Sequence, residues 1–203
     1  MSIKPGNLFI ITAPSGAGKS SLIKSIIEEG KIELSVSATT REPRINEIHG
    51  QDYSFLSINE FQKLIDQNSF LEYAKVHEHF YGTLISHVSK KLDTGIDIIL
   101  DIDVQGFYQL QEKNIEYTSI FILPPSLDIL RERLKDRATE STSSIDIRLL
   151  NAKKEIKAAP YFDYLVLNDN FEEALSKLRD IFEANNQIDQ QMEQNILNEL
   201  LNS

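Results

Sequence analysis

Residues 8–27 read LFIITAPSGAGKSSLIKSII and predict a strand, a tight loop and a helix in direct succession. The apolar run at the start has no polar alternation, which is typical of a central parallel strand that is covered on both faces. Apolar side chains then recur at helical spacing from Leu22 to Ile27. We therefore expect the loop amides and the helix N-terminus to point at one place, where they would bind phosphate.

The loop resembles the pattern G-x-x-x-x-G-K-[ST], in which a lysine reaches the outer phosphates and a hydroxyl binds Mg²⁺. Lys19 and Ser20 occupy these positions, whereas Ala13 stands where the pattern has its first glycine. Pro14 disfavours the helical region for the residue before it, so Ala13 is expected to be extended with a negative φ. The other interpretation, a glycine-containing turn into an ordinary helix, is disfavoured by the lysine, the hydroxyl and the strand together.

Composition limits the classes of partner. The chain has 203 residues, which suits one domain of ordinary size with inserted lobes, and its 21 Lys and Arg against 31 Asp and Glu give a net charge of -10. This balance disfavours tight nonspecific binding to nucleic acid, so an anionic ligand must meet a local basic cluster. The absence of cysteine excludes disulfides and thiolate zinc sites. With no signal-peptide core and no membrane-length apolar run, we expect a cytoplasmic protein without membrane partners.

The segment from residue 34 to residue 72 carries charged residues that could bind a ligand. A short alternating strand is predicted at 34–37, and it leads into a basic turn where Arg41 and Arg44 flank a proline and could form a guanidinium fork for a phosphate. A solvated loop is the other interpretation of this turn. A helix is expected after Asn59 as its cap, and a strand follows in which the carboxylate of Glu72 has apolar neighbours.

A second buried strand at 96–100 ends in Asp101 and Asp103, and alternation places both carboxylates on one side. In open α/β sheets, ligands bind beyond the carboxyl ends of the strands, so an acid here suits a Mg²⁺-holding role. Further buried strands are predicted at 119–123 and 164–168.

The C-terminal third predicts two helices around a polar turn. Ser126 is the expected N-cap of the first helix, and arginines lie on both helices: Arg133, Arg137 and Arg148. This pattern is typical of a lid that closes over phosphates, and two surface helices with solvated charges are the other interpretation. The tail 185–203 carries a thin apolar stripe, which predicts a helix that packs on a neighbouring subunit in a homo-oligomer, or a frayed end.

From Leu8 to about Ala184 the chain resembles guanylate kinases. The stretches that carry the resemblance are APSGAGKSS, SVSATTREPR, HGQDYSF, FLEYA, YGT, ILDIDVQG, FILPPS and LVLND. The resemblance implies an α/β fold with a three-layer P-loop NTPase core around a central parallel sheet, an inserted mixed α/β GMP-binding lobe and a helical lid. The implied boundaries are core at 1–35, GMP lobe at 36–90, core at 91–125, lid at 126–158, and core with a C-terminal helix at 159–203.

The resemblance also implies the site residues. ATP would bind Ala13, Pro14, Ser15, Gly16, Ala17, Gly18, Lys19, Ser20, Ser21 and Asn168. The GMP phosphate would bind Arg41, Arg44, Tyr53 and Tyr81. Glu72 would read guanine, with further base contacts from Ser37, Thr83 and Asp103. Mg²⁺ would be held by Ser20 and Asp101, and the catalytic cations would be Lys19, Arg133, Arg137 and Arg148.

The implied reaction is transfer of the γ-phosphoryl group of ATP to GMP or dGMP. A family-like interaction module without catalysis is the alternative from another class, but such modules have lost parts of the phosphate loop that persist here. A different nucleoside monophosphate kinase would need a base pocket without Glu72, and a GTPase is disfavoured because no N-K-x-D motif occurs. Asp136 and Ala138 depart from the glycines common in the family, which predicts a stiffer hinge beside Arg137.

Overall fold

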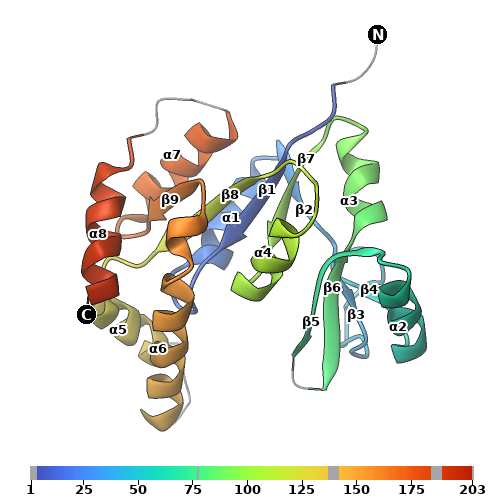
Figure 1. Cartoon of the computed structure of the whole chain (residues 1–203), viewed down its shortest axis with the longest axis horizontal. Helices are drawn as coiled ribbons and strands as arrows, with labels where there is room; N and C mark the ends of the chain where they lie inside the picture. Colours follow the sequence, from blue (N-terminus) through green and yellow to red (C-terminus); the bar gives the residue numbers. More distant parts are fainter. Residues whose placement is uncertain (1–3, 77, 137–141, 184–188, 203) are drawn as a thin grey trace. The chain divides into compact units, whose positions relative to one another are not determined.

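The computed structural model describes residues 4–76, 78–136, 142–183 and 189–202, and it has a mixed α/β fold (Figure 1). Its larger sheet has the strand order β2-β7-β1-β8-β9. These strands are β1 (Leu8–Thr12), β2 (Ile32–Leu34), β7 (Asp97–Asp101), β8 (Thr118–Leu123) and β9 (Tyr164–Leu167). The chain divides into two compact units, 1–10 with 31–117 and 11–30 with 118–203, and each is described by itself.

The buried strands expected from the sequence are present. Every residue of β1 is buried, and β8 and β9 pair in parallel with Phe121 opposite Leu165. The strand predicted at 34–37 was wrong in position, because β2 ends at Leu34. Ile32 is the residue of this segment that is buried, and it pairs with Asp97 of β7, so the sheet uses the residues before the alternating run.

The unit of residues 1–10 and 31–117 holds a second sheet in the order β4-β3-β6-β5. Its strands are β3 (Ala38–Thr39), β4 (Ser54–Phe55), β5 (Phe70–Val76) and β6 (His79–Leu84). The helices are α2 (Ile58–Asp66), α3 (Ile85–Leu92) and α4 (Val104–Gln111). Phe61 of α2 stacks on Phe70 with ring centroids 4.4 Å apart, and both belong to a buried apolar cluster with Ala38 and Leu84.

The predicted cap of α2 was wrong. Ser57, not Asn59, is the N-cap, because its hydroxyl accepts from the Glu60 amide while the Glu60 carboxylate accepts from the Ser57 amide. This reciprocal pair satisfies two backbone donors at once, which Asn59 inside the first turn could not do.

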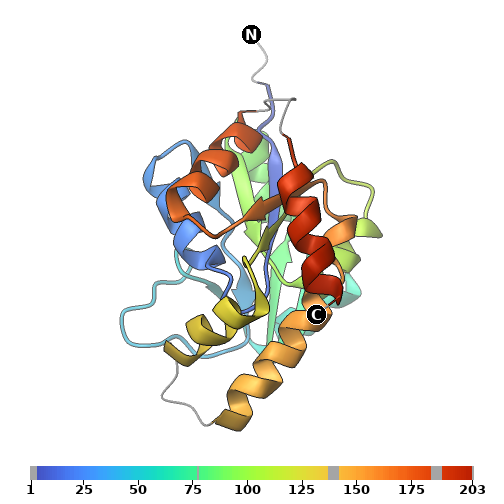
Figure 2. The same cartoon turned by 90° about the vertical axis from the view of Figure 1, so that its left-hand side faces the viewer.

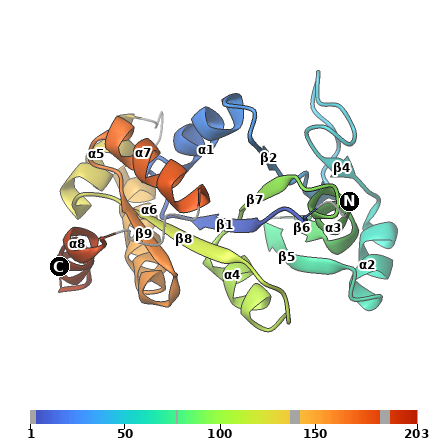
Figure 3. The same ribbon diagram turned by 90° about the horizontal axis from the view of Figure 1, so that it is seen from above.

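The unit of residues 11–30 and 118–203 holds α1 (Lys19–Glu28), α5 (Leu127–Asp136), α6 (Thr142–Ile156), α7 (Phe171–Phe182) and α8 (Gln191–Asn202). Ser126 caps α5 as expected, since its hydroxyl accepts from the Ile129 amide. Helix α7 packs against α1 (Figure 3), and α8 packs against α6 and β9 (Figure 2). No helix in the described ranges is long and apolar enough to cross a membrane.

Candidate functional site: a phosphate loop and an arginine–glutamate pocket

The loop after β1 has the geometry of a phosphate cradle. Gly16 and Gly18 have φ of 91° and 95°, a backbone conformation that residues with a side chain rarely adopt. Ala13 is not among the described residues with positive φ, as predicted. Gly18 is the N-cap residue of α1 and carries no side chain that could cap the helix. The start of α1 is therefore not capped by a side chain of Gly18, and the positive end of its helix dipole faces the loop, which is the arrangement that binds anions.

Asn168 secures this loop from the end of β9. Its side-chain amide donates to the Ala17 carbonyl at 2.7 Å, and its backbone amide donates to the Leu123 carbonyl at 2.9 Å. The side chain is buried and lies so close to the loop that a Cβ at Gly18 would stand 2.1 Å from its Nδ2. Asn168 therefore fixes the loop backbone within this unit, a contact that the sequence did not predict.

Arg133 of α5 approaches the same loop. Its Nη2 donates to the Asn168 carbonyl at 3.0 Å, while its Nη1 is buried and has no hydrogen-bond partner in the described part of the chain. Both residues line a cavity of about 340 Å³ together with Gly16, Gly18 and other residues of this unit. A buried, unpaired guanidinium nitrogen is costly, so this end of Arg133 favours an anionic ligand.

The helices of the predicted lid have their own core. Leu130 and Leu134 of α5 pack with Ile145 and Ala152 of α6, and Arg131 pairs with Asp146 at 2.6 Å. A Cβ at Gly16 would lie within about 3.3 Å of Leu130 and Leu134 side-chain atoms, so α5 rests directly on the loop. Arg148 is half-buried on α6. Arg137 lies outside the described residues.

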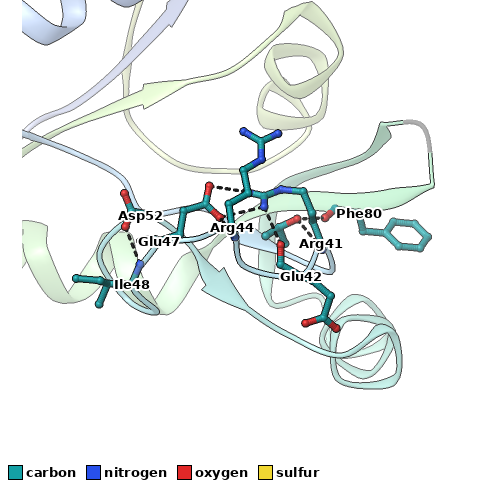
Figure 4. Close-up of polar contacts among 8 residues, drawn as sticks. Arg41, Glu42, Arg44, Glu47, Ile48, Asp52 and Phe80 are labelled. Carbon is teal, nitrogen blue, oxygen red and sulfur yellow. Dashed lines mark hydrogen bonds and ion pairs between the residues drawn. The ribbon is translucent and has the colours of Figure 1, made fainter.

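In the other unit, three of the residues predicted to bind the GMP phosphate lie together: the Arg41 guanidinium and the rings of Tyr53 and Tyr81. Arg41 lies over the Tyr53 ring at 5.4 Å, and Tyr53 and Tyr81 meet edge to face at 6.1 Å. The pKa of Arg41 is raised, chiefly by a hydrogen bond to Glu47 and further by Tyr81. Glu47 accepts from both terminal nitrogens of Arg41, at 2.9 Å and 3.0 Å (Figure 4).

Arg44 belongs to the same loop through its backbone. Its amide donates to Glu47 Oε2 at 2.7 Å, and its carbonyl accepts from the Glu47 amide at 3.1 Å. Among the residues that the structure describes, the Arg44 guanidinium has no hydrogen-bond partner, and the residue is exposed. The basic turn predicted from the sequence is therefore an ordered loop with one paired and one available guanidinium.

Glu72 forms the centre of a small buried acceptor pocket in the same unit. A register shift between Phe70 and Glu72 brings Glu72 opposite Thr83 in the β5–β6 pair, and the Thr83 hydroxyl donates to Glu72 Oε1 at 2.7 Å. Such bulges re-aim side chains next to active sites. On α4, Gly106 comes so close that a Cβ there would lie 3.2 Å from Glu72 Oε2.

The charge of Glu72 is not offset within the pocket. Burial raises the pKa of its carboxyl, the nearby charge of Asp103 raises it further, and the Thr83 hydrogen bond opposes both effects. Asp103 is the N-cap of α4 and accepts from the Gly106 amide at 2.9 Å. A ligand that brings N–H donors to Glu72 would stabilise the ionised form. Because Thr83 donates to Glu72 here, its hydroxyl must turn before it can donate to a ligand.

The residues predicted for the metal are exposed oxygen donors. Ser20 is in the first turn of α1, and Asp101 ends β7 with the buried Ile102 after it, which places Asp101 and Asp103 on the exposed side as alternation predicts. A hydroxyl and a carboxylate suit Mg²⁺, which prefers few protein ligands and keeps waters and phosphate oxygens. No cluster of three or more His, Asp or Glu that could hold a metal occurs within the described ranges. Ser37 is half-buried, and its carbonyl accepts from the Ser54 amide.

Comparisons with known proteins agree with these features. The family model described as Guanylate kinase matches residues 5–185. A guanylate kinase of Legionella pneumophila (strain Paris) is 45% identical over 91% of this chain and 89% of the relative, and one of Caldanaerobacter subterraneus subsp. tengcongensis is 46% identical over 91% and 90%. The crystal structure of guanylate kinase from Anaplasma phagocytophilum has a TM-score of 0.66 at 30% identity and covers 91% of this chain and 88% of that one. TT1252 from Thermus thermophilus, at 15% identity and a TM-score of 0.52, shares the fold.

Proposed function

Because the chain belongs to the guanylate kinase family, we propose that it transfers the γ-phosphoryl group of ATP to GMP and forms ADP and GDP. The observation that carries this proposal is the buried, uncompensated carboxylate of Glu72, which is suited to the N1–H and N2–H₂ donors of guanine. Adenine has a bare N1 acceptor and no 2-amino group, so it would bring neither of these donors to the carboxylate. Sites of this kind reject analogues that lack the bonding group by about 10⁴ to 10⁵.

The acceptor phosphate is assigned to Arg41, Arg44, Tyr53 and Tyr81. Their contacts with one another support this, because two guanidiniums and two phenols supply donors for every outer oxygen of a phosphate. Ser37, Thr83 and Asp103 are assigned to the base. The lobe boundaries that we propose for this acceptor half are residues 36–90.

The donor half is assigned to the loop 13–21 and Asn168. The loop amides and Lys19 would bind the ATP phosphates, and the ordered loop backbone supports this. Mg²⁺ with ATP would be held by Ser20 and Asp101, and when bound it neutralises charge on the phosphates. Asn168, which the resemblance places at the adenine end, also holds the loop itself.

The acceptor phosphate is already anionic, so the transfer needs no strong general base. Catalysis would consist of alignment and of charge neutralisation by Lys19, Arg133, Arg148 and Arg137. The unpaired Nη1 of Arg133 supports its assignment, since a transferring phosphoryl group would satisfy it. We propose residues 126–158 as the lid that excludes water during transfer.

The proposed partners are ATP and GMP, with neither nucleic acid nor membrane. The buried face of α8, through Leu197 and Leu200, is covered by this chain, so a homo-oligomer through α8 would use its exposed residues, among them Met192 and Leu201. We propose the cytoplasm as the compartment, from the acidic, cysteine-free composition.

A coupled assay of ADP formation tests the proposal with ATP as donor and GMP, dGMP, AMP or UMP as acceptor. We expect turnover with GMP and little with AMP or UMP. Lys19→Ala should lose activity by orders of magnitude and keep the circular dichroism spectrum of the folded chain. Absence of GMP-dependent turnover, with binding of another protein retained, would instead favour the interaction module.

A further inference from the structure

Glu47 is the acidic centre of the loop of residues 41–47, which carries Arg41 and Arg44. Its carboxylate accepts from Arg41 Nη1 and Nη2 and from the Arg44 amide. The Arg41 and Glu47 side chains are 14% and 18% exposed, so this is a largely buried, bidentate ion pair. Its geometry is that of the strong class of charge-assisted hydrogen bonds.

The contacts of Arg41 determine which of its donors remain for a ligand. Nη1 donates to the Glu42 carbonyl at 2.7 Å and to Glu47, and Nη2 donates to Glu47 as well (Figure 4). A guanidinium has five N–H groups, and neither Glu42 nor Glu47 uses the Nε–H and the second Nη2–H, which lie parallel on one edge. The Tyr81 hydroxyl, which is assigned to the same phosphate, also interacts with this guanidinium. The Nε–Nη2 edge matches two oxygens of a phosphate, while Glu47 occupies the other edge.

The turn before Glu47 holds the carboxylate in place. The Glu47 amide donates to the Arg44 carbonyl, and Asn46 between them has a φ of 76°, as the third residue of a type II turn requires. Moving Glu47 away would break its bonds to both arginines at once. The pKa of Glu47 is lowered, first by Arg41 and then by the Arg44 amide, so the side chain is ionised at neutral pH.

We propose that Glu47 is a positioning residue that holds Arg41 with its Nε–Nη2 edge toward the acceptor phosphate. This inference rests on the proposed function, because it gives the acceptor phosphate to Arg41. If Glu47 competed with the phosphate, its carboxylate would have to leave Arg41 before GMP could bind. Arg41 instead has enough N–H groups to bind the Glu47 carboxylate on one edge and the phosphate on the other. Loss of Glu47 should therefore weaken phosphate binding instead of strengthening it.

The test compares Glu47→Gln with wild type in steady-state kinetics. We expect the KM for GMP to rise by about tenfold to a hundredfold while the KM for ATP stays within about twofold. Direct binding adds a sharper readout, since guanosine lacks the phosphate. GMP should bind Glu47→Gln more weakly by the same factor, and guanosine should bind both proteins equally.

Asp66→Asn is the matched control, because it removes one negative charge from an exposed side chain of the same unit, on α2. It should leave the KM for GMP unchanged. An unchanged or lowered KM for GMP in Glu47→Gln, or an equal loss of guanosine binding, would overturn the positioning role. A wild-type protein that does not phosphorylate GMP would overturn the proposed function itself.

Discussion

Gly18→Ala is expected to destabilise the fold through two separate effects. The first is backbone strain, since φ at Gly18 is 95° and an L-residue with a left-handed backbone costs about 1–2 kcal/mol. The second is steric, because the new Cβ would lie 2.1 Å from Asn168 Nδ2 and must displace it. The displaced amide would leave the Ala17 carbonyl without its 2.7 Å hydrogen bond, which costs about 1–3 kcal/mol for a buried group.

Gly30→Ala separates these two effects. Gly30 has a φ of 74°, and a Cβ there would have nothing within 4 Å, so this variant carries the strain alone. Urea unfolding followed by far-UV circular dichroism should give a loss of about 1–2 kcal/mol for Gly30→Ala and about 2–5 kcal/mol for Gly18→Ala.

A double-mutant cycle of Gly18→Ala with Asn168→Ala measures the coupling between these two positions. Once the amide is gone, Gly18→Ala should cost only its strain, about 1–2 kcal/mol. Equal losses for the two glycine variants, or full additivity of Gly18→Ala with Asn168→Ala, would refute the close approach of Asn168 to the loop.

Three further outcomes follow from the structure. Ser57→Ala should lower the free energy of unfolding by about 1 kcal/mol and Asn59→Ala by less than about 0.5 kcal/mol, as urea unfolding would measure, because only Ser57 caps α2. Burial raises the pKa of Glu72, so the folded state favours its protonated form. The unfolding free energy of wild type relative to Glu72→Gln should therefore fall as pH rises from 4.5 through the raised pKa. A difference in unfolding free energy that does not change with pH would contradict this. Arg133→Ala should reduce kcat by about 10² or more with little change in the KM for GMP, and a normal kcat would remove Arg133 from the proposed catalytic set.

The parts of the fold that the sequence predicted depend on local chemistry. The unbroken apolar run of β1 and the glycines of the loop determine their own conformations, so both could be predicted from neighbouring residues. The position of β2 could not, because pairing with β7 decides which three residues join the sheet. The cap of α2 was wrongly assigned because Ser57 and Asn59 are both good capping residues, and only the position of Glu60 three residues after Ser57 distinguishes them.

The sequence names candidate site residues, but it could not give their contacts. The resemblance named Arg41, Glu72 and Asn168, but the hydrogen bond from Asn168 to Ala17 joins residues 151 apart in the chain. Glu47 was missed although it follows Arg44 by three residues, the spacing of a turn that closes on itself. An acidic residue shortly after two arginines indicates a possible ion pair. Whether the pair forms depends on the turn at residues 44–47, which sequence spacing alone does not specify.

Whether the buried Glu72 carboxylate recognises guanine can be measured as the acceptor selectivity of Glu72→Gln. The ratio of kcat/KM for GMP to that for AMP would be measured in wild type and in the variant with the same ATP-coupled assay. Wild type should favour GMP by about 10⁴ or more, and the variant should lose most of this preference through a lower kcat/KM for GMP. A ratio that stays at the wild-type value in a folded Glu72→Gln protein would mean that the Glu72 carboxylate does not recognise guanine.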